Sequence, residues 1–425
     1  MSEAKGMTKT MREINDTLWL GKLPKTWNTV ELGQVYEERK VKVKETIYEP
    51  LSVTMKGIVP QLASAVKAAE GSDRKLVKAG DFVINSRSDR KGACGVSEKD
   101  GSCSVINIVI RPRNLQTAEY YNYALLSVYF PEEFYRWGHG IASDLWTTRW
   151  SEMRKIKLPN PPDSVKEKIV FHIKNKCNEI AKLEKDTRRI IEDYKILKNS
   201  YIEDLVVHGV RKCESWKKSD ERGFGNIPSH WHMLKIKRIF NIRKEIAGRE
   251  GLQLLSITQK GIVPKDISRN EGQTAADYSK YQIVHVDDYA MNHMDLRTGW
   301  VDLSNYEGVT SPDYRVFYIN NEMRFNKDYY KYVMQYCYIK EVFYSAAQGI
   351  NENGRYRLKT DSFLNFRLMV PPIEEQIEIA QKLNEKIGAI NEILESKEQF
   401  LENLIAYRRI MYYEYVTGKK EVPES

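Results

Sequence analysis

A ten-residue segment occurs twice in this chain, and the repeat constrains the fold more than any other feature. Residues 51–60 and 255–264 differ at only two positions of the ten. The same offset of 204 residues (255 minus 51) places Trp27 on Trp231. We interpret the chain as a tandem duplication.

Further matches extend across each half, at offsets that grow slowly along the chain. Because loops accept small insertions, such a drift is expected between duplicated domains. A period near 200 residues is domain-sized and far longer than a solenoid repeat, so it favours two similar globular units. At an offset of 207, the matching residues are Asp81, Asn85, Arg90 and Gly92 with Asp288, Asn292, Arg297 and Gly299; at 210, Pro161 and Pro162 match Pro371 and Pro372.

The composition is that of an ordinary globular chain with a basic balance. Of 425 residues, 41% are hydrophobic and 29% charged, which suits two to four domains. We find no apolar run of roughly 18 residues and no signal-peptide pattern at the start, so we expect a cytoplasmic protein. The net charge of +9 and the 26 tyrosines suit nucleic acid, although proteins that merely stay soluble reach similar charges.

The pattern of hydrophobic residues predicts an α+β unit in each half, followed by a long helix. After a leader at 1–20, short strand-like segments broken by Gly, Asn and Asp predict globular units at 21–160 and 210–370. Each unit ends in a proline pair, beyond which helical periodicity predicts long helices at 161–209 and 371–420. We expect Ser164 and Glu167 to form a capping box at the first of these helices.

Apolar residues in both helices alternate at spacings of three and four, which is typical of a coiled-coil seam. We therefore predict that the two helices pack on each other, antiparallel, and separate the two units. The alternative is that each helix packs on its own globular unit. The seam residues are Ile173, Ile180, Leu183, Ile190, Tyr194, Leu197 and Tyr201 in the first helix and Leu383, Ile387, Ile390, Leu394, Leu401 and Leu404 in the second.

Motifs for catalysis are weak. Residues 160–163 resemble the N-P-P-aromatic tetrapeptide with which amino-methyltransferases hold a target base, but Asp163 replaces the ring and the second copy has no Asn. We find no P-loop, and the five cysteines lack the spacing of a zinc site. His230 and His232 have no Cys or carboxylate beside them that would suggest a metal site. We predict no catalytic or metal site and no cofactor in this chain.

Cationic loops recur at the same place in both halves. The segments 85–92 and 292–299 each follow a strand-like stretch, and they contain Arg, Asn and Asp, the side chains that read base edges. Their sequences differ, as expected if the two units share a scaffold and read different bases. The alternative is a pair of solvated surface loops.

Two further repeated features fit DNA. The Lys-Gly pairs at 56–57 and 260–261 are identical in both copies and so suit the phosphate backbone, although a turn that needs Gly explains them equally well. Gly-rich segments at 138–144 and 348–355 allow close approach to a ligand. The predicted DNA-binding residues are Lys56, Arg87, Asp89, Arg90, Lys91, Lys260, His293, Asp295, Arg297, Gln348, Asn351, Arg355 and Arg357.

The chain resembles the specificity (S) subunits of type I restriction-modification enzymes from Gly21 to Lys420. The resemblance rests on residues 227–231 at the start of a unit, on residues 80–87, and on residues 371–376 at the head of a long helix. It implies two target recognition domains that each read one half of a split duplex DNA sequence. It also implies a helical spacer that sets the gap and docks two methyltransferase (M) subunits, with restriction (R) subunits joining the complex.

In such a complex, S-adenosylmethionine, ATP and Mg belong to the partner subunits, and this chain is not itself an enzyme. The resemblance makes Pro371, Pro372, Glu375 and Gln376 candidate partner-docking residues. The first copy departs from this pattern, since residues 161–166 lack the Glu-Gln pair. A freestanding tandem DNA-binding protein, such as a repressor or architectural factor, is the main alternative, and a protein-binding scaffold is another.

Overall fold

The computed structural model describes residues 10–14, 17–44, 46–61, 73–140, 146–221, 223–265, 278–346 and 356–423. The chain forms two compact units. Unit 1 comprises Met1–Thr187 together with Gln399–Ser425, and unit 2 comprises Arg188–Glu398. Each unit therefore contains one globular part and a segment of both long helices, so compactness divides the chain differently from the linear domain limits predicted above.

The globular part of unit 1 is built from short strands and four short α-helices, in the part of the chain that the structure describes. Its elements are β1 (Met11–Glu13), β2 (Lys22–Pro24), β3 (Asn28–Glu31), α1 (Leu32–Val35), β4 (Tyr36–Glu38), β5 (Lys42–Val43), β6 (Leu51–Thr54), β7 (Gly57–Pro60), β8 (Arg74–Val77), β9 (Phe82–Asn85), the 3-10 helix η1 (Ser88–Arg90), β10 (Cys94–Val96), β11 (Gly101–Cys103), β12 (Asn107–Pro112), α2 (Leu115–Leu125), α3 (Phe130–Arg136), α4 (Trp150–Met153) and β13 (Lys157–Asn160).

Unit 2 repeats most of these elements in the same order. They are β14 (Trp216–Lys218), β15 (Asn226–Pro228), β16 (His232–Lys235), η2 (Ile236–Arg238), β17 (Phe240–Ile242), β18 (Leu255–Thr258), β19 (Gly261–Pro264), β20 (Gln282–Val284), β21 (Tyr289–Met291), β22 (Val301–Leu303), β23 (Gly308–Thr310), β24 (Arg315–Ile319), α6 (Lys327–Ile339), η4 (Val342–Ala346), α7 (Thr360–Asn365) and β25 (Arg367–Val370).

The sheets confirm the duplication. The central antiparallel sheet has the order β4-β12-β9-β10 in unit 1 and β17-β24-β21-β22 in unit 2. The register is also the same, since Ile108 pairs with Ile84 in unit 1 and Arg315 pairs with Met291 in unit 2, both 207 residues further on. The predicted α+β class and the tandem arrangement are therefore confirmed.

A buried ion pair occupies the same place in each central sheet. Arg39 donates to both carboxylate oxygens of Asp81, at 2.6 and 2.9 Å, and Arg243 contacts Asp288 at the same two distances. The hydrogen bond to the carboxylate raises the pKa of each arginine. Both carboxylates are nearly fully buried. The pairs therefore fix the first strand of each sheet to the strand that precedes the predicted base-reading segment, 85–92 in unit 1 and 292–299 in unit 2. We call these two segments the reading loops.

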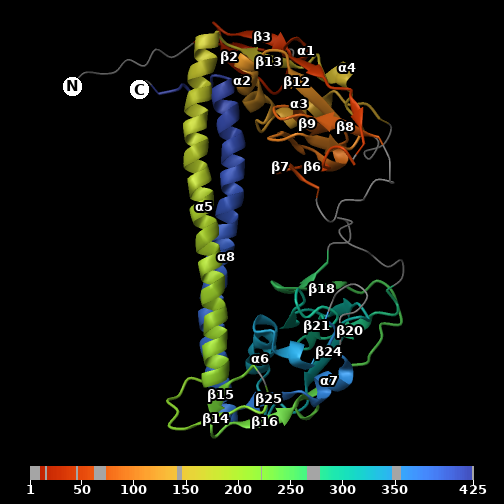
Figure 1. Cartoon of the computed structure of the whole chain (residues 1–425), viewed down its shortest axis with the longest axis vertical. Coiled ribbons are helices and arrows are strands. Elements are labelled where there is room, and N and C mark those ends of the chain that lie inside the picture. Colours follow the sequence, from red (N-terminus) through yellow and green to blue (C-terminus); the bar gives the residue numbers. More distant parts are fainter. Residues whose placement is uncertain are drawn as a thin grey trace, which may run out of the picture. The chain divides into compact units, whose positions relative to one another are not determined.

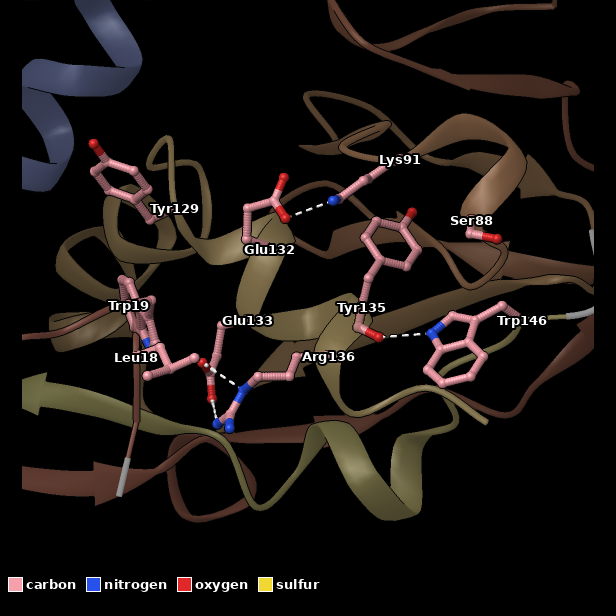
Figure 2. A pocket seen from close by; sticks show the side chains of 10 residues that line it. All are labelled: Leu18, Trp19, Ser88, Lys91, Tyr129, Glu132, Glu133, Tyr135, Arg136 and Trp146. Carbon is pink, nitrogen blue, oxygen red and sulfur yellow. Dashed lines mark hydrogen bonds and ion pairs between the residues drawn. The ribbon is translucent and has the colours of Figure 1, made fainter. Parts of the chain in front are cut away.

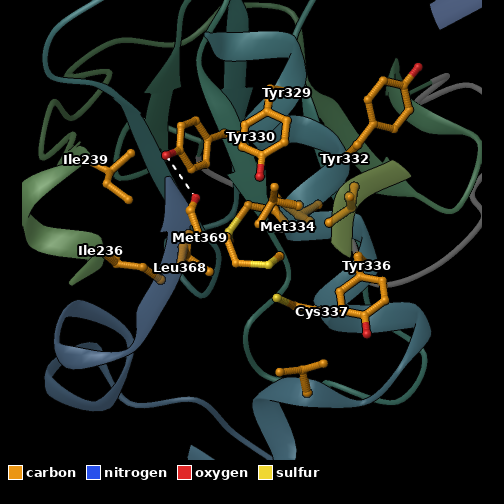
Figure 3. Close-up of a cluster of buried hydrophobic side chains, with 14 of the residues drawn as sticks. Ile236, Ile239, Tyr329, Tyr330, Tyr332, Met334, Tyr336, Cys337, Leu368 and Met369 are labelled. Atoms are coloured by element: carbon orange, nitrogen blue, oxygen red, sulfur yellow. Dashed lines mark hydrogen bonds between the residues drawn. The ribbon is translucent and has the colours of Figure 1, made fainter. Parts of the chain in front are cut away.

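Aromatic side chains fill the cores. In unit 2, α6 contributes Tyr329 and Tyr330, which are fully buried, and the Tyr330 hydroxyl donates to the Met369 carbonyl in β25 at 3.2 Å (Figure 3). Burial raises the pKa of both phenols far above the ordinary value, so they stay neutral. Tyr120 and Tyr121 of α2 fill the equivalent place in unit 1.

Two long helices, α5 (Asp163–His208) and α8 (Ile373–Val416), begin directly after the proline pairs. The carbonyls of Pro162 and Pro372 each accept hydrogen bonds from the backbone N–H groups three and four residues on. The helix α5 therefore starts one residue before Ser164, and the capping box predicted there is wrong. The helices end at His208 and Val416, one and four residues before the predicted limits of 209 and 420, and Gly209 and Gly418 just beyond them adopt φ values of 77° and 65°.

Within unit 1, the start of α5 lies beside the end of α8 (Figure 1). His172 Nε2 lies 2.9 Å from Tyr415 Oη, and Arg408 donates to Glu184 at 2.8 Å. Contacts that advance along α5 thus move back along α8. The two segments are antiparallel.

Unit 2 has the same arrangement between the end of α5 and the start of α8 (Figure 1). Lys198 Nζ donates to the Asn391 side chain at 2.8 Å, and Arg211, just beyond α5, pairs with Glu378. The predicted antiparallel pairing of the two long helices is therefore confirmed in each unit.

The seam was predicted correctly for α8 and only in part for α5. Ile173 and Ile180 are buried, whereas Leu183, Ile190 and Leu197 are 47%, 37% and 40% exposed. A pair of helices covers only a narrow stripe of each, so the second row of apolar residues on α5 falls outside the contact. Among the described residues, none of the helices is both long enough and apolar enough to cross a membrane.

Candidate nucleic-acid interface

The repeated ten-residue segments form hairpins, β6–β7 in unit 1 and β18–β19 in unit 2. In each, a threonine hydroxyl accepts from the lysine backbone N–H at 3.1 Å and donates to the glycine carbonyl at 2.9 Å. Gly57 and Gly261 have φ values of 108° and 110°, so the turn needs glycine. The lysines sit at the tips, where Lys56 is exposed and Lys260 pairs with Glu398 at 2.6 Å.

The predicted reading loop of unit 1 projects from the end of β9 through η1. Arg87, Asp89 and Arg90 are all exposed, and the Asn85 side chain accepts from the Arg87 backbone N–H at 3.0 Å. Lys91 is half exposed and pairs with Glu132 of α3. The loop thus presents two arginines and one carboxylate on a backbone that hydrogen bonds hold in place.

The corresponding loop of unit 2 is organised around Asp295. Its carboxylate accepts from the backbone N–H groups of Arg297 and Thr298 at 3.0 and 3.2 Å and from the Thr298 hydroxyl at 2.6 Å. A Cβ added to Gly299 would lie 2.2 Å from the Asp295 carbonyl oxygen, so this turn closes only on glycine. Asp295 therefore shapes the loop, and Arg297 is exposed beside it.

His293 differs from the prediction. Its side chain is 7% exposed, and burial together with Arg315 and Arg357 lowers its pKa to about 3. A neutral, buried imidazole is not placed to contact base edges at the surface, so the expectation that His293 reads bases from an exposed loop needs correction. Arg357 is exposed, whereas Gln348, Asn351 and Arg355 lie outside the described residues.

In each unit, the backbone carbonyl of an aromatic residue that the sequence analysis did not single out accepts a hydrogen bond from the reading loop. The Trp146 carbonyl accepts from the Ser88 N–H at 3.2 Å, and the Tyr356 carbonyl accepts from the Leu296 N–H at 3.1 Å. Trp146 lies two residues after the Gly-rich segment 138–144, and Tyr356 comes directly after the segment 348–355. The signal was present in the sequence, since Trp146 and Tyr356 match at the offset of 210.

Each of these two residues is itself held by a further contact. Trp146 Nε1 donates to the Tyr135 carbonyl at 2.8 Å (Figure 2), and Tyr356 packs edge-on against Tyr344 at 4.8 Å between ring centroids. A Cβ at Gly138 would lie 2.4 Å from the Trp146 ring nitrogen, so this glycine makes room for the indole.

A cavity of about 490 Å³ opens beside the unit 1 loop (Figure 2). Its two carboxylates are both paired, Glu132 with Lys91 and Glu133 with Arg136. Because each acid has a basic partner, the cavity holds no free acid–base pair of the kind that general acid–base catalysis uses. It is lined by Leu18, Trp19, Ser88, Lys91, Tyr129, Glu132, Glu133, Tyr135, Arg136 and Trp146.

The candidate partner-docking residues at the head of α8 have structural roles in unit 2. Glu375 is 1% exposed, and its carboxylate accepts from His230 at 2.9 Å and from the Trp231 indole at 3.1 Å. Gln376 is fully buried and accepts from the Asn326 N–H at 2.9 Å.

These contacts connect the start of α8 to His230 and Trp231, just before β16, and to Asn326 at the start of α6. Pro371 is buried and Pro372 exposed. Direct docking through the Glu375 and Gln376 side chains is therefore incompatible with the structure of this chain, because both are already occupied.

No group of His, Cys, Asp and Glu suited to a metal ion occurs among the described residues. Burial raises the pKa of Cys94 and of Cys103 to about 11, so these two thiols are protonated and unreactive at neutral pH.

No protein-family model matches the sequence. Among solved structures, one that addresses complex assembly and conformational transition of the type I R-M system matches with a TM-score of 0.57 at 11% identity, covering 93% of this chain and 98% of that chain. The chain has the fold of that type I R-M structure. This likeness confirms the resemblance described above at the level of the fold.

Two further matches cover similar shares of both chains at lower scores. They are the HsdS subunit from Thermoanaerobacter tengcongensis, with a TM-score of 0.39, 12% identity and coverage of 94% and 98%, and the type I S subunit from M. genitalium, with 0.35, 14% and coverage of 95% and 99%. The comparison of folds rests on the first structure.

Proposed function

We propose that this chain is the DNA specificity subunit of a type I restriction-modification complex. The observation that carries the proposal is the fold shared with a type I R-M structure over nearly the whole of both chains. Two units with one scaffold and different loops suit a target made of two different half-sites. Each unit would read one half of a gapped duplex sequence.

In this proposal the invariant and variable parts have separate tasks. The lysines at the hairpin tips contact phosphates, which every DNA sequence shares. The loops after β9 and β21 reach base edges, with Arg87 and Arg90 in unit 1 and Arg297 in unit 2 as donors to guanine. The backbone held by Trp146 or Tyr356 orients these side chains.

The long helices would set the gap and dock methyltransferase subunits. Support comes from large apolar side chains that remain exposed on both helices, since exposed apolar residues in number mark surfaces for partners. Restriction subunits would join the same complex. Methylation with S-adenosylmethionine, and cleavage with ATP and Mg, would belong to those partners, and this chain would be non-catalytic. The exposed residues include Phe171, Leu183, Ile190, Ile196, Leu197, Phe400 and Ile410.

The experiment combines the chain with its methyltransferase partner and sequences the methylated sites. A single bipartite gapped motif supports the proposal. Activity that is indifferent to sequence, or full and specific binding by this chain alone with no gain from the partner, contradicts it; the second result would favour a freestanding DNA-binding protein.

Substitution of one loop tests the division between units. We expect Arg297→Ala to relax recognition at one position of one half-site by about 1–3 kcal/mol, the value of a good bidentate contact to a base. Arg90→Ala, at the equivalent position, is the matched control and should relax the other half-site. An equal loss at both half-sites from either variant contradicts the proposal.

The gap is tested by lengthening both helices. Seven residues inserted after Thr187 and seven after Glu398 keep the heptad register and add about 10 Å. At 3.4 Å per base pair we expect the preferred gap to grow by about three base pairs with both half-sites unchanged. An unchanged gap would show that the helices do not measure it.

A further inference from the structure

Three buried polar atoms in unit 2 have no hydrogen-bond partner within the described part of the chain: Oη of Tyr329, Nδ1 of His293 and Nη1 of Arg315. The last two belong to basic residues, and the charge of Arg315 acts on His293. Their side chains are 7% and 4% exposed. Buried polar groups are almost always paired, and an unpaired one is costly to keep, so two together need a reason.

Strand pairing brings these two side chains to the same place. Arg315 lies opposite Met291 in the β21–β24 pair, and His293 follows Met291 by two residues. The chain turns after Met291, where the His293 N–H donates to the Met291 carbonyl at 3.1 Å, and the charge of Arg315 acts on the His293 imidazole and lowers its pKa. Leu358 lies against both, because its N–H donates to the His293 carbonyl at 3.0 Å and its carbonyl accepts from Arg315 Nη2 at 3.1 Å.

The cluster is positive, and the described residues supply no carboxylate that pairs with it. Besides Leu358, Arg315 contacts the Thr360 hydroxyl at 3.3 Å and the Phe363 ring at 4.4 Å, and no carboxylate of the described residues forms an ion pair with it. Burial lowers the pKa of Arg315 to about 10, opposed by Tyr338 and assisted by Arg357, so the guanidinium stays charged at neutral pH. A buried charge is normally paired.

We propose that His293 and Arg315 form a binding site for a phosphate-type oxyanion in unit 2. Nη1 of Arg315 and the Nδ1–H tautomer of His293 would both donate to it. A tetrahedral oxyanion accepts several charge-assisted hydrogen bonds at once, and it supplies the negative charge that the cluster lacks. The exposed Arg357, whose charge acts on both residues, extends the positive field to the surface.

Unit 1 lacks this site and so provides an internal comparison. At the offset of 207, Ser86 and Ile108 replace His293 and Arg315. The Ser86 hydroxyl donates to the Ile106 carbonyl, so its polar atom is already paired. The inference goes beyond the proposed function, because reading two half-sites does not require an oxyanion site in one unit alone.

The first test titrates the full chain, in phosphate-free buffer, with inorganic phosphate. NMR of histidine-labelled protein should show a saturable shift of the His293 resonances, with little change in the other six histidines. The melting temperature should rise with phosphate. In Arg315→Met, which keeps the length of the side chain and removes its charge, both responses should be lost. Arg238→Met, at an exposed position of unit 2, should keep both and controls for net charge.

The second test asks whether the phosphate belongs to DNA. If a backbone phosphate occupies the site, free phosphate gives no shift, but Arg315→Met reduces the salt dependence of binding to a mixed-sequence duplex by about one unit of slope, the value of one phosphate contact. Either response supports the proposal and identifies the source.

Absence of both responses in the wild-type and variant chains overturns the proposal. If Arg315→Met fails to fold, the wild-type titration decides for free phosphate and Arg357→Met replaces it in the duplex measurement. The phosphate arm does not involve the methyltransferase partner, so its failure is distinct from a failure of the proposed function.

Discussion

The two units share the same sheets and helices but differ in the side chains that lie near the reading loops. The ion pairs Arg39–Asp81 and Arg243–Asp288 have the same geometry. Two equivalent positions, one just after β9 or β21 and one in β12 or β24, differ: unit 1 has Ser86 and Ile108 there, and unit 2 has His293 and Arg315. Residues that fix strand to strand are retained, and residues near the reading loops vary. A duplicated protein can thus change what it recognises without rebuilding its core.

The joints between helix and globular part differ in a similar way. At Gly418 an added Cβ would lie 2.9 Å from the Trp27 ring, and at Gly209 it would lie 2.9 Å from the Trp231 ring. Within the described ranges, the second joint alone also contains a buried carboxylate, since Glu375 accepts from Trp231. The packing is shared, and the polar contact is specific to unit 2.

We expect the largest effect from removing these tryptophans. Trp231→Ala should destabilise unit 2 by about 3–5 kcal/mol, the usual cost of deleting a buried large ring. Trp27→Ala should destabilise unit 1 by less, because no carboxylate loses a donor there. Hydrogen exchange read separately for each unit measures both. Equal losses in the two variants would show that the Glu375 contact adds nothing.

The ion pairs should give equal effects. Asp288→Asn removes the closest partner of Arg243 and leaves only Glu245, at 3.7 Å, so it should cost unit 2 about 3 kcal/mol, as breaking buried pairs does. Asp81→Asn should cost unit 1 the same, since the distances and burial match. Urea unfolding followed by probes in each unit provides the measurement, and clearly unequal losses would break the comparison of the two units.

A smaller effect is expected from pH over the range from 7 to 5. The pKa of His293 is about 3 in the folded chain, below the ordinary value of 6.5, so between these values only the unfolded chain binds the proton. Unit 2 should lose up to about 1.4 kcal/mol for each unit of pH below 6.5, and the loss should end near pH 3.

His293→Ser, which copies the residue of unit 1, should remove this component of the pH dependence. The measurement compares the free energy of unfolding of both chains from pH 7 to 5 in phosphate-free buffer. Identical pH profiles would mean that the imidazole is not buried as the structure has it.

Much of the shared fold of the two units was predictable, because each weak sequence pattern occurs in both copies and the second occurrence supports the first. The strands, the helix ends at Gly209 and Gly418 and the antiparallel pairing all follow from patterns that occur twice. The side of α5 that remains exposed did not follow, since a heptad pattern identifies an apolar stripe but not how much of it one partner helix covers.

The candidate site was less predictable because burial depends on residues far apart in the chain. Glu375 looks like a surface acid at a helix start until Trp231 folds over it, and His293 looks like a loop residue until Arg315 and Leu358 enclose it. Loop positions such as Arg87 and Arg297 were placed at the surface, and their role as DNA contacts stays a prediction.

The chain order of unit 1 has a consequence for synthesis. Its core contains Leu404, Met411 and Val416 of α8, and the Tyr120 hydroxyl donates to the Val416 carbonyl at 2.7 Å. The globular part of unit 1 therefore leaves the ribosome long before the α8 segment that completes its core. Unit 2, in contrast, is one continuous stretch of chain. We expect nascent chains stalled just after Glu398, with a linker that clears the exit tunnel, to protect unit 2 from protease while unit 1 is still cleaved.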